Sequence, residues 1–139
     1  ALELAVEELP EKTRWLQVLR DRLIEGLLGM GDVVLNGHPS SRLPGNVNVS
    51  FNYIEGEALL LGLDLEGIAA SSGSACTSGS PEPSHVLLAM GLDHQIARGS
   101  LRLTLGRGNS DADVDYLFTV LSPLVKRLRK MSALYPGQG

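Results

Sequence analysis

Residues 47–53 constrain the fold more than any other part of the chain. Apolar or aromatic residues alternate strictly with polar ones there, in the order Val-Asn-Val-Ser-Phe-Asn-Tyr. A period of two is typical of a β-strand with one buried side and one wetter side. The chain is therefore expected to build a sheet that buries one of its faces.

Helical spacing predicts a long helix at each end of the chain. Apolar residues recur every three or four positions over residues 2–27 and again over residues 114–131, as in amphipathic helices. Pro10 either kinks the first helix or opens a second one. Ser110 and Asp113 resemble a capping box before the last helix, with Asp113 in the place of the usual Glu.

Shorter elements are expected between these helices. Strands are predicted at residues 33–35, 67–70 and 101–105, and helices at residues 56–64, 84–90 and 93–97. This order predicts one α+β domain over residues 1–139, a small mixed or antiparallel sheet with helices packed on one face.

Charge and composition argue against several function classes. The 12 basic and 16 acidic side chains give a net charge of −4, whereas nucleic-acid binding needs clustered positive charge. Four basic residues fall near the end of a predicted helix, where cations complement the helix dipole: Lys126, Arg127, Arg129 and Lys130. No apolar run approaches the ~20 residues of a membrane span, so no membrane partner is expected. A single cysteine cannot form an internal disulfide, which suits the cytoplasm.

The only cysteine, Cys76, lies in a segment dominated by serine and glycine. Seven of the ten residues in 71–80 are Ser or Gly, so the segment cannot bury enough apolar surface to offset its ordering entropy. We therefore expect a mobile, solvated loop. A thiol on such a tether suggests chemistry in which sulfur moves between two places.

Several kinds of site can be built from a thiol, and spacing separates them. Attack by Cys76 requires a thiolate, and His38, His85, His94 and Arg102 are the candidates to promote its formation. Cys76, His85 and His94 lie nine residues apart, unlike the paired ligands of structural zinc sites. A cysteine-protease dyad needs a rigidly held thiol, and a serine- and glycine-rich tether holds a thiol poorly. Nucleotide-binding and serine-hydrolase motifs are absent from the sequence.

Arg102 is the second residue of interest. It alternates with Leu101 and Leu103 on a predicted strand and so faces away from them. A guanidinium fork matches a carboxylate bidentately, as recognition of an amino acid would require. Spacing alone favours the alternative, a surface arginine on the wetter face of the sheet.

Six motifs taken together resemble the C-terminal part of NifS/IscS-type cysteine desulfurases, of the class-V aminotransferase family. The resemblance runs in order from about Leu2 to Leu128, and the cysteine motif resembles the subgroup with the longer loop. The motifs are Arg-Leu-Pro-Gly-Asn (42–46), Asn-Val-Ser-Phe (48–51), Glu-Gly-Glu (55–57), Ser-Ser-Gly-Ser-Ala-Cys (71–76), Glu-Pro-Ser-His-Val-Leu (82–87) and Gly-Ser-Leu-Arg-Leu-Thr-Leu-Gly-Arg (99–107).

The resemblance implies the small domain of a fold-type I pyridoxal phosphate enzyme that is a homodimer at full length. It implies that Cys76 takes the sulfur of L-cysteine as a persulfide, with release of alanine. The sulfur then passes to an acceptor such as an iron-sulfur scaffold protein. Arg102 matches the arginine that binds the substrate carboxylate, which reverses the interpretation from spacing.

The cofactor-binding part of that family has no counterpart in this sequence. The chain begins in a helical pattern without an initiator Met, which suggests a piece of a longer polypeptide. Its only lysines, Lys12, Lys126 and Lys130, fall in the predicted end helices. We expect the chain alone neither to bind pyridoxal phosphate appreciably nor to turn over cysteine. A non-catalytic persulfide carrier and a selenocysteine lyase relative stay open as alternatives.

Overall fold

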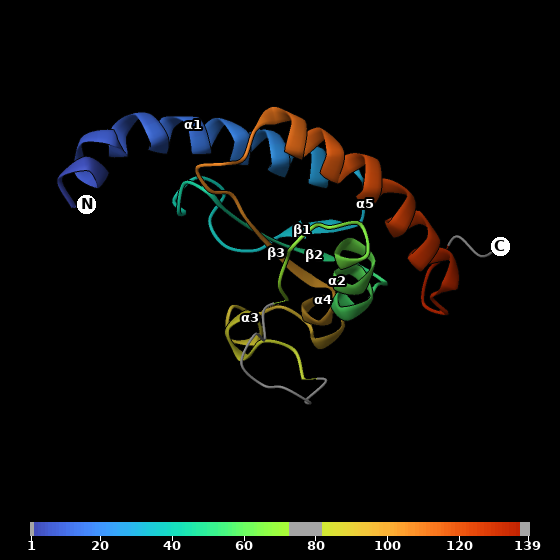
Figure 1. The fold of residues 1–139 in the computed structure, drawn as a ribbon. Coiled ribbons are helices and arrows are strands. Elements are labelled where there is room, and N and C mark those ends of the chain that lie inside the picture. The colour runs from blue at the N-terminus through green and yellow to red at the C-terminus, as the bar shows by residue number, and fades with distance from the viewer. Residues whose placement is uncertain (1, 73–81, 137–139) are drawn as a thin grey trace.

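A three-stranded antiparallel sheet lies at the centre of the computed structural model, which describes residues 2–72 and 82–136 (Figure 1). The sheet order is β1-β2-β3, and the predicted α+β class is confirmed. The elements in chain order are α1 (Leu2–Gly29), β1 (Val33–Leu35), β2 (Asn46–Phe51), α2 (Gly56–Asp64), α3 (His85–Ala89), α4 (His94–Arg98), β3 (Ser100–Thr104) and α5 (Asp111–Met131).

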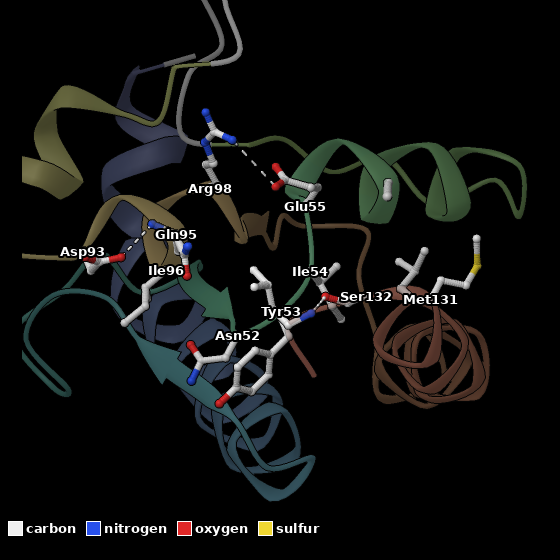
Figure 2. Close-up of a pocket in the computed structure, with 13 residues that line it drawn as sticks. Asn52, Tyr53, Ile54, Glu55, Asp93, Gln95, Ile96, Arg98, Met131 and Ser132 are labelled. Carbon is white, nitrogen blue, oxygen red and sulfur yellow. Dashed lines mark hydrogen bonds and ion pairs between the residues drawn. The ribbon is translucent and has the colours of Figure 1, made fainter. Parts of the chain in front are cut away.

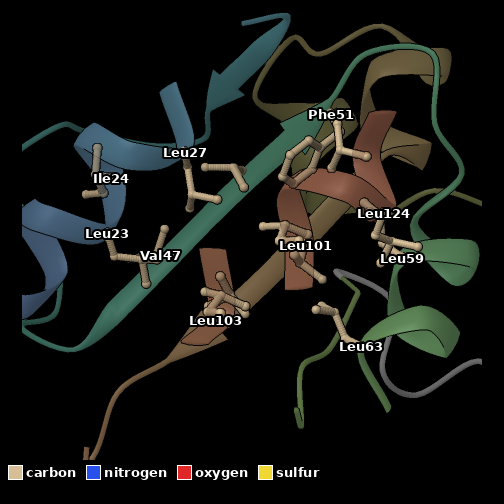
Figure 3. Close-up of a cluster of buried hydrophobic side chains, with 14 of the residues drawn as sticks. Leu23, Ile24, Leu27, Val47, Phe51, Leu59, Leu63, Leu101, Leu103 and Leu124 are labelled. Carbon is tan, nitrogen blue, oxygen red and sulfur yellow. The ribbon is translucent and has the colours of Figure 1, made fainter. Parts of the chain in front are cut away.

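Helices α1, α2 and α5 cover the apolar face of this sheet. Figure 1 shows α1 and α5 side by side above the strands, whereas α3 and α4 lie on the side remote from α1. The core between the helices and the sheet is made of large apolar side chains, and burying each one stabilises the fold by about 1.5–3 kcal/mol. The buried side chains that meet in this core include Leu23, Leu27, Val47, Phe51, Leu59, Leu63, Leu101 and Leu103 (Figure 3). In the described ranges, no helix combines the length and apolar character needed to cross a membrane.

The predicted helix boundaries are largely confirmed. α1 runs through Pro10 as one helix, so Pro10 does not open a second helix. Asp93 caps α4 by accepting a hydrogen bond from the Gln95 backbone amide at 2.8 Å. The Asp113 carboxylate accepts a hydrogen bond from the Ser110 backbone amide at 2.7 Å, as the capping box predicted.

Of the predicted strands, one ends earlier than expected and one does not form. β2 ends at Phe51, because Asn52 and Tyr53 form a turn in which Tyr53 has a left-handed φ of 68°. Residues 67–70 form no strand, since the Ile68 amide bonds to the Leu63 carbonyl at 2.9 Å instead. An isolated bridge between Ser71 and Arg102 follows that segment.

The C-terminal half of α5 also differs from the prediction. Met131 was placed on the buried face but is 75% exposed, because the helix ends there beyond the core. Arg129 is 7% exposed, and its guanidinium donates to the carbonyls of Met30, Gly31 and Asp32 at 3.3, 2.6 and 3.1 Å. Arg129 therefore holds the chain just past the end of α1, in addition to any effect on its own helix.

Arg129→Ala is expected to lower the free energy of unfolding by about 2 kcal/mol, because three carbonyls lose a charged donor. Chemical denaturation of the chain measures this. Arg127→Ala is the matched control, since Arg127 is an exposed neighbour on the same helix, and its effect should stay within about 0.5 kcal/mol. Equal losses in the two variants would contradict the role given to Arg129.

Candidate functional site

The face of the sheet opposite the core is polar. Its central pair is Asn48 of β2 opposite Arg102 of β3. The flanking pairs on this face are Asn46 with Thr104 and Ser50 with Ser100. Arg102 is half-buried. The prediction that it faces away from Leu101 and Leu103 is confirmed, since both leucines lie in the core.

Arg102 is held by Ser71, the first residue of the serine- and glycine-rich segment. Their backbones exchange two hydrogen bonds, Ser71 N to Arg102 O at 3.1 Å and Arg102 N to Ser71 O at 2.6 Å. The Arg102 Nε also donates to the Ser71 hydroxyl at 3.0 Å. The two terminal amino groups of this guanidinium have no hydrogen-bond partner among the described residues, which leaves a fork suited to a carboxylate.

Asn36 holds the other side of the same row. Its backbone amide bonds to the Asn48 carbonyl at 2.9 Å. Its side-chain amide donates to Asn48 Oδ1 at 2.7 Å and to the Ser50 hydroxyl at 2.9 Å. Asn36, Asn48, Arg102 and Ser71 therefore form one polar row across the sheet. Sequence reasoning gave no role to Asn36, Ser71 or Asn48, although the alternation over residues 47–53 placed Asn48 on the wetter face.

Residues 36–42 form a turn beside this row. Arg42 donates to the carbonyls of Asn36 at 2.7 Å and His38 at 2.8 Å. Burial lowers the pKa of Arg42, and the positive charge of Arg20 adds to the effect. The His38 Nδ1 accepts hydrogen bonds from the backbone amides of Ser40 and Ser41 at 3.2 and 2.9 Å. His38 thus closes a turn rather than facing the row.

The structure does not bring the predicted histidines together with the row. His85 and His94 are the exposed first residues of α3 and α4. Within residues 2–72 and 82–136, no three His, Cys, Asp or Glu side chains gather in a way that could hold a metal ion.

Cys76 lies outside the described residues, but the chain limits its distance from the row. It follows Ser71 by five residues, so its Cα is within about 18 Å of the Ser71 Cα in any conformation.

The polar row offers no lysine for pyridoxal phosphate. Lys12 pairs with Glu8 on α1, and Lys126 and Lys130 are exposed on α5. None of the three is on the sheet. The residues of this chain therefore do not fit the aldehyde of that cofactor.

A separate pocket of about 530 Å³ lies where the end of β2 meets α4 and the end of α5. Figure 2 shows Arg98 reaching Glu55 across one side of it, and this ion pair measures 4.0 Å. Neither Arg102 nor Ser71 lines this pocket. It is distinct from the polar row, and no local pattern in the sequence indicates it.

Comparison with known proteins agrees with this architecture. A relative from Methanosarcina thermophila, cysteine desulfurase IscS, is 58% identical over 138 residues, which are 99% of this chain and 34% of that protein. Cysteine desulfurase IscS 1 of Archaeoglobus fulgidus is 54% identical over 135 residues, 97% of this chain and 35% of that protein. The chain thus spans about a third of the length of the curated relatives it matches.

Solved structures give the same family of folds. A NifS-like protein superposes with a TM-score of 0.70 at 32% identity, covering 93% of this chain and 30% of that one. A NifS-like protein from Rickettsia africae gives a TM-score of 0.78 at 24% identity, covering 88% and 31%, and so supports the fold. The sequence model of the class-V aminotransferases matches residues 4–117. Because its fold matches and the family model covers most of its length, the chain belongs to the class-V aminotransferase family.

Proposed function

We propose that this chain supplies the sulfur-accepting thiol and the carboxylate-binding arginine of a cysteine desulfurase. The Cys76 thiolate attacks the sulfur of L-cysteine, and an S–S bond forms as the Cβ–S bond of the substrate breaks. The electron pair of that bond stays on carbon, which takes up a proton, so alanine leaves and a persulfide remains on Cys76. The outer sulfur then passes to an acceptor protein for iron-sulfur cluster or thio-cofactor assembly.

The observation that carries the proposal is the junction between Ser71 and Arg102. Arg102 is half-buried, its two terminal amino groups have no partner within residues 2–72 and 82–136, and it is fixed by the residue from which the cysteine segment departs. A carboxylate bound at Arg102 would place the substrate sulfur within the range of Cys76. The relatives named cysteine desulfurase support the same reaction for the complete protein.

In this proposal the cofactor is bound by the part of the complete protein that corresponds to the remaining length of the relatives. Pyridoxal phosphate would supply the electron sink for carbon–sulfur cleavage, and the lysine that binds it would lie in the part this chain does not span. We also propose that the complete protein is a cytoplasmic homodimer.

Mass spectrometry of the complete protein tests the proposal. After incubation with L-cysteine and no reductant, the peptide that contains Cys76 is expected to gain the mass of one sulfur atom, removable by dithiothreitol. D-cysteine is the control and should add nothing. Failure of L-cysteine to add sulfur would refute the desulfurase. If a persulfidated donor protein added the sulfur instead, the chain would be a non-catalytic persulfide carrier.

A further inference from the structure

We infer that Asn48 is a second ligand of the substrate carboxylate beside Arg102. Asn36 and Ser71 are positioning residues that hold these two ligands from opposite sides of the row. This inference rests on the proposed function and adds a binding residue to its site.

The register of the sheet makes Asn48 and Arg102 direct neighbours. They are paired across β2 and β3 on the same face, and side chains opposite each other in antiparallel strands have Cβ atoms about 4.5–5.5 Å apart. An amide and a guanidinium at that spacing can donate to the two oxygens of one carboxylate.

Among the described residues, neither side chain has a partner for its outward donors. Asn48 uses its oxygen to accept from Asn36, and its Nδ2 has no hydrogen-bond partner in the described ranges. Arg102 donates from Nε to Ser71, and its two terminal amino groups have no partner in that part of the chain. Asn48, like Arg102, is only half-buried, so a ligand can reach it.

The charge of this face suits an anion. The strand residues that share it are asparagine, serine, threonine and arginine, with no acidic side chain among the three pairs. One cationic fork next to an amide donor therefore meets no competing carboxylate from β2 or β3.

Asn36 occupies its place at a cost to stability. It is 5% exposed, and its Oδ1 is buried without a hydrogen-bond partner in the described part of the chain. Buried polar atoms of this kind are rare because no hydrogen bond offsets the free energy of removing them from water. A residue that breaks a folding rule is typical of a functional site, and here it fixes the amide of Asn48.

Ligand binding to the complete protein, measured by calorimetry, tests the inference without requiring turnover. The probes are S-methyl-L-cysteine and 2-(methylthio)ethylamine, which differ by the carboxylate. Asn48→Asp removes the donor and adds a like charge, so affinity for S-methyl-L-cysteine should fall about 30-fold. Affinity for the amine should change less than about threefold.

Asn46→Asp is the matched control, since Asn46 is on the same strand and face but pairs with Thr104. It adds the same charge and should change either affinity less than about threefold.

Ser71→Ala tests the positioning role of Ser71. It should weaken the binding of S-methyl-L-cysteine about tenfold and raise KM more than it lowers kcat. Ser71→Thr, which keeps the hydroxyl, should restore both values.

Arg102→Gln separates this inference from the proposed function. If Arg102→Gln weakens S-methyl-L-cysteine at least about 100-fold while Asn48→Asp leaves it unchanged, the inference is wrong and the function stands. If Arg102→Gln also has no effect, the carboxylate site of the proposed function is wrong. Equal losses for Asn46→Asp and Asn48→Asp would also overturn the inference. Should circular dichroism show that Asn48→Asp is unfolded, Asn48→Ala replaces it, with about a tenfold loss expected.

Discussion

Cys76→Ser is expected to reduce sulfide release from L-cysteine by the complete protein at least about 1,000-fold. A hydroxyl at neutral pH is not ionised, whereas a thiol is partly thiolate and intrinsically nucleophilic. Cys76 is the only cysteine of this chain. Sulfide and alanine, measured together in the presence of a thiol reductant, give the rate.

Ser74→Ala and Ser78→Ala are the matched controls, since each changes a hydroxyl in the same segment and leaves the thiol. Both should keep at least about half of the wild-type rate. A Cys76→Ser variant that releases sulfide as fast as these controls would contradict the proposed function. If the variant loses cysteine desulfuration but still cleaves selenocysteine, the selenocysteine lyase alternative gains support.

The parts of the fold predicted correctly are those encoded within a few residues. Alternation around Val49 fixed the buried face of β2, and the same rule placed Arg102 on the polar face of β3. Asp93 and Asp113 bind backbone amides two and three residues away, so their capping roles are visible in the sequence.

The features that were missed depend on distant contacts. Arg129 bonds to carbonyls 97 to 99 residues away, so local spacing shows only its place on α5. Ser71 meets Arg102 across 31 residues, and Asn36 meets Asn48 across 12. Strand register depends on the hydrophobic patterns of both paired strands and on the connection between them, so the pattern of one strand does not show its partners. The sequence therefore placed Arg102 on the polar face of β3 but did not show that Ser71 bonds to it.

Gly99→Ala is expected to destabilise the fold by about 4 kcal/mol or to prevent folding. A Cβ on Gly99 would lie 2.1 Å from the carbonyl oxygen of Phe51 and 2.8 Å from that of Ile54. Both obstacles are backbone atoms, so no side chain can rotate away. The φ of Gly99 is −79°, which alanine adopts freely, and the loss would therefore come from steric overlap alone.

The same substitution should also act on the site. The Gly99 carbonyl accepts the Phe51 amide at 2.9 Å, and β3 begins at the next residue, so relief of the overlap must move β3 against β2. Gly29→Ala is the matched control, because nothing lies within 4 Å of its Cβ and alanine favours a helix by up to about 1 kcal/mol over glycine. Thermal denaturation should give a large fall in Tm for Gly99→Ala and an equal or higher Tm for Gly29→Ala. If Gly99→Ala instead melts like wild type, β2 and β3 are not packed as closely as the pairing of Asn48 with Arg102 requires.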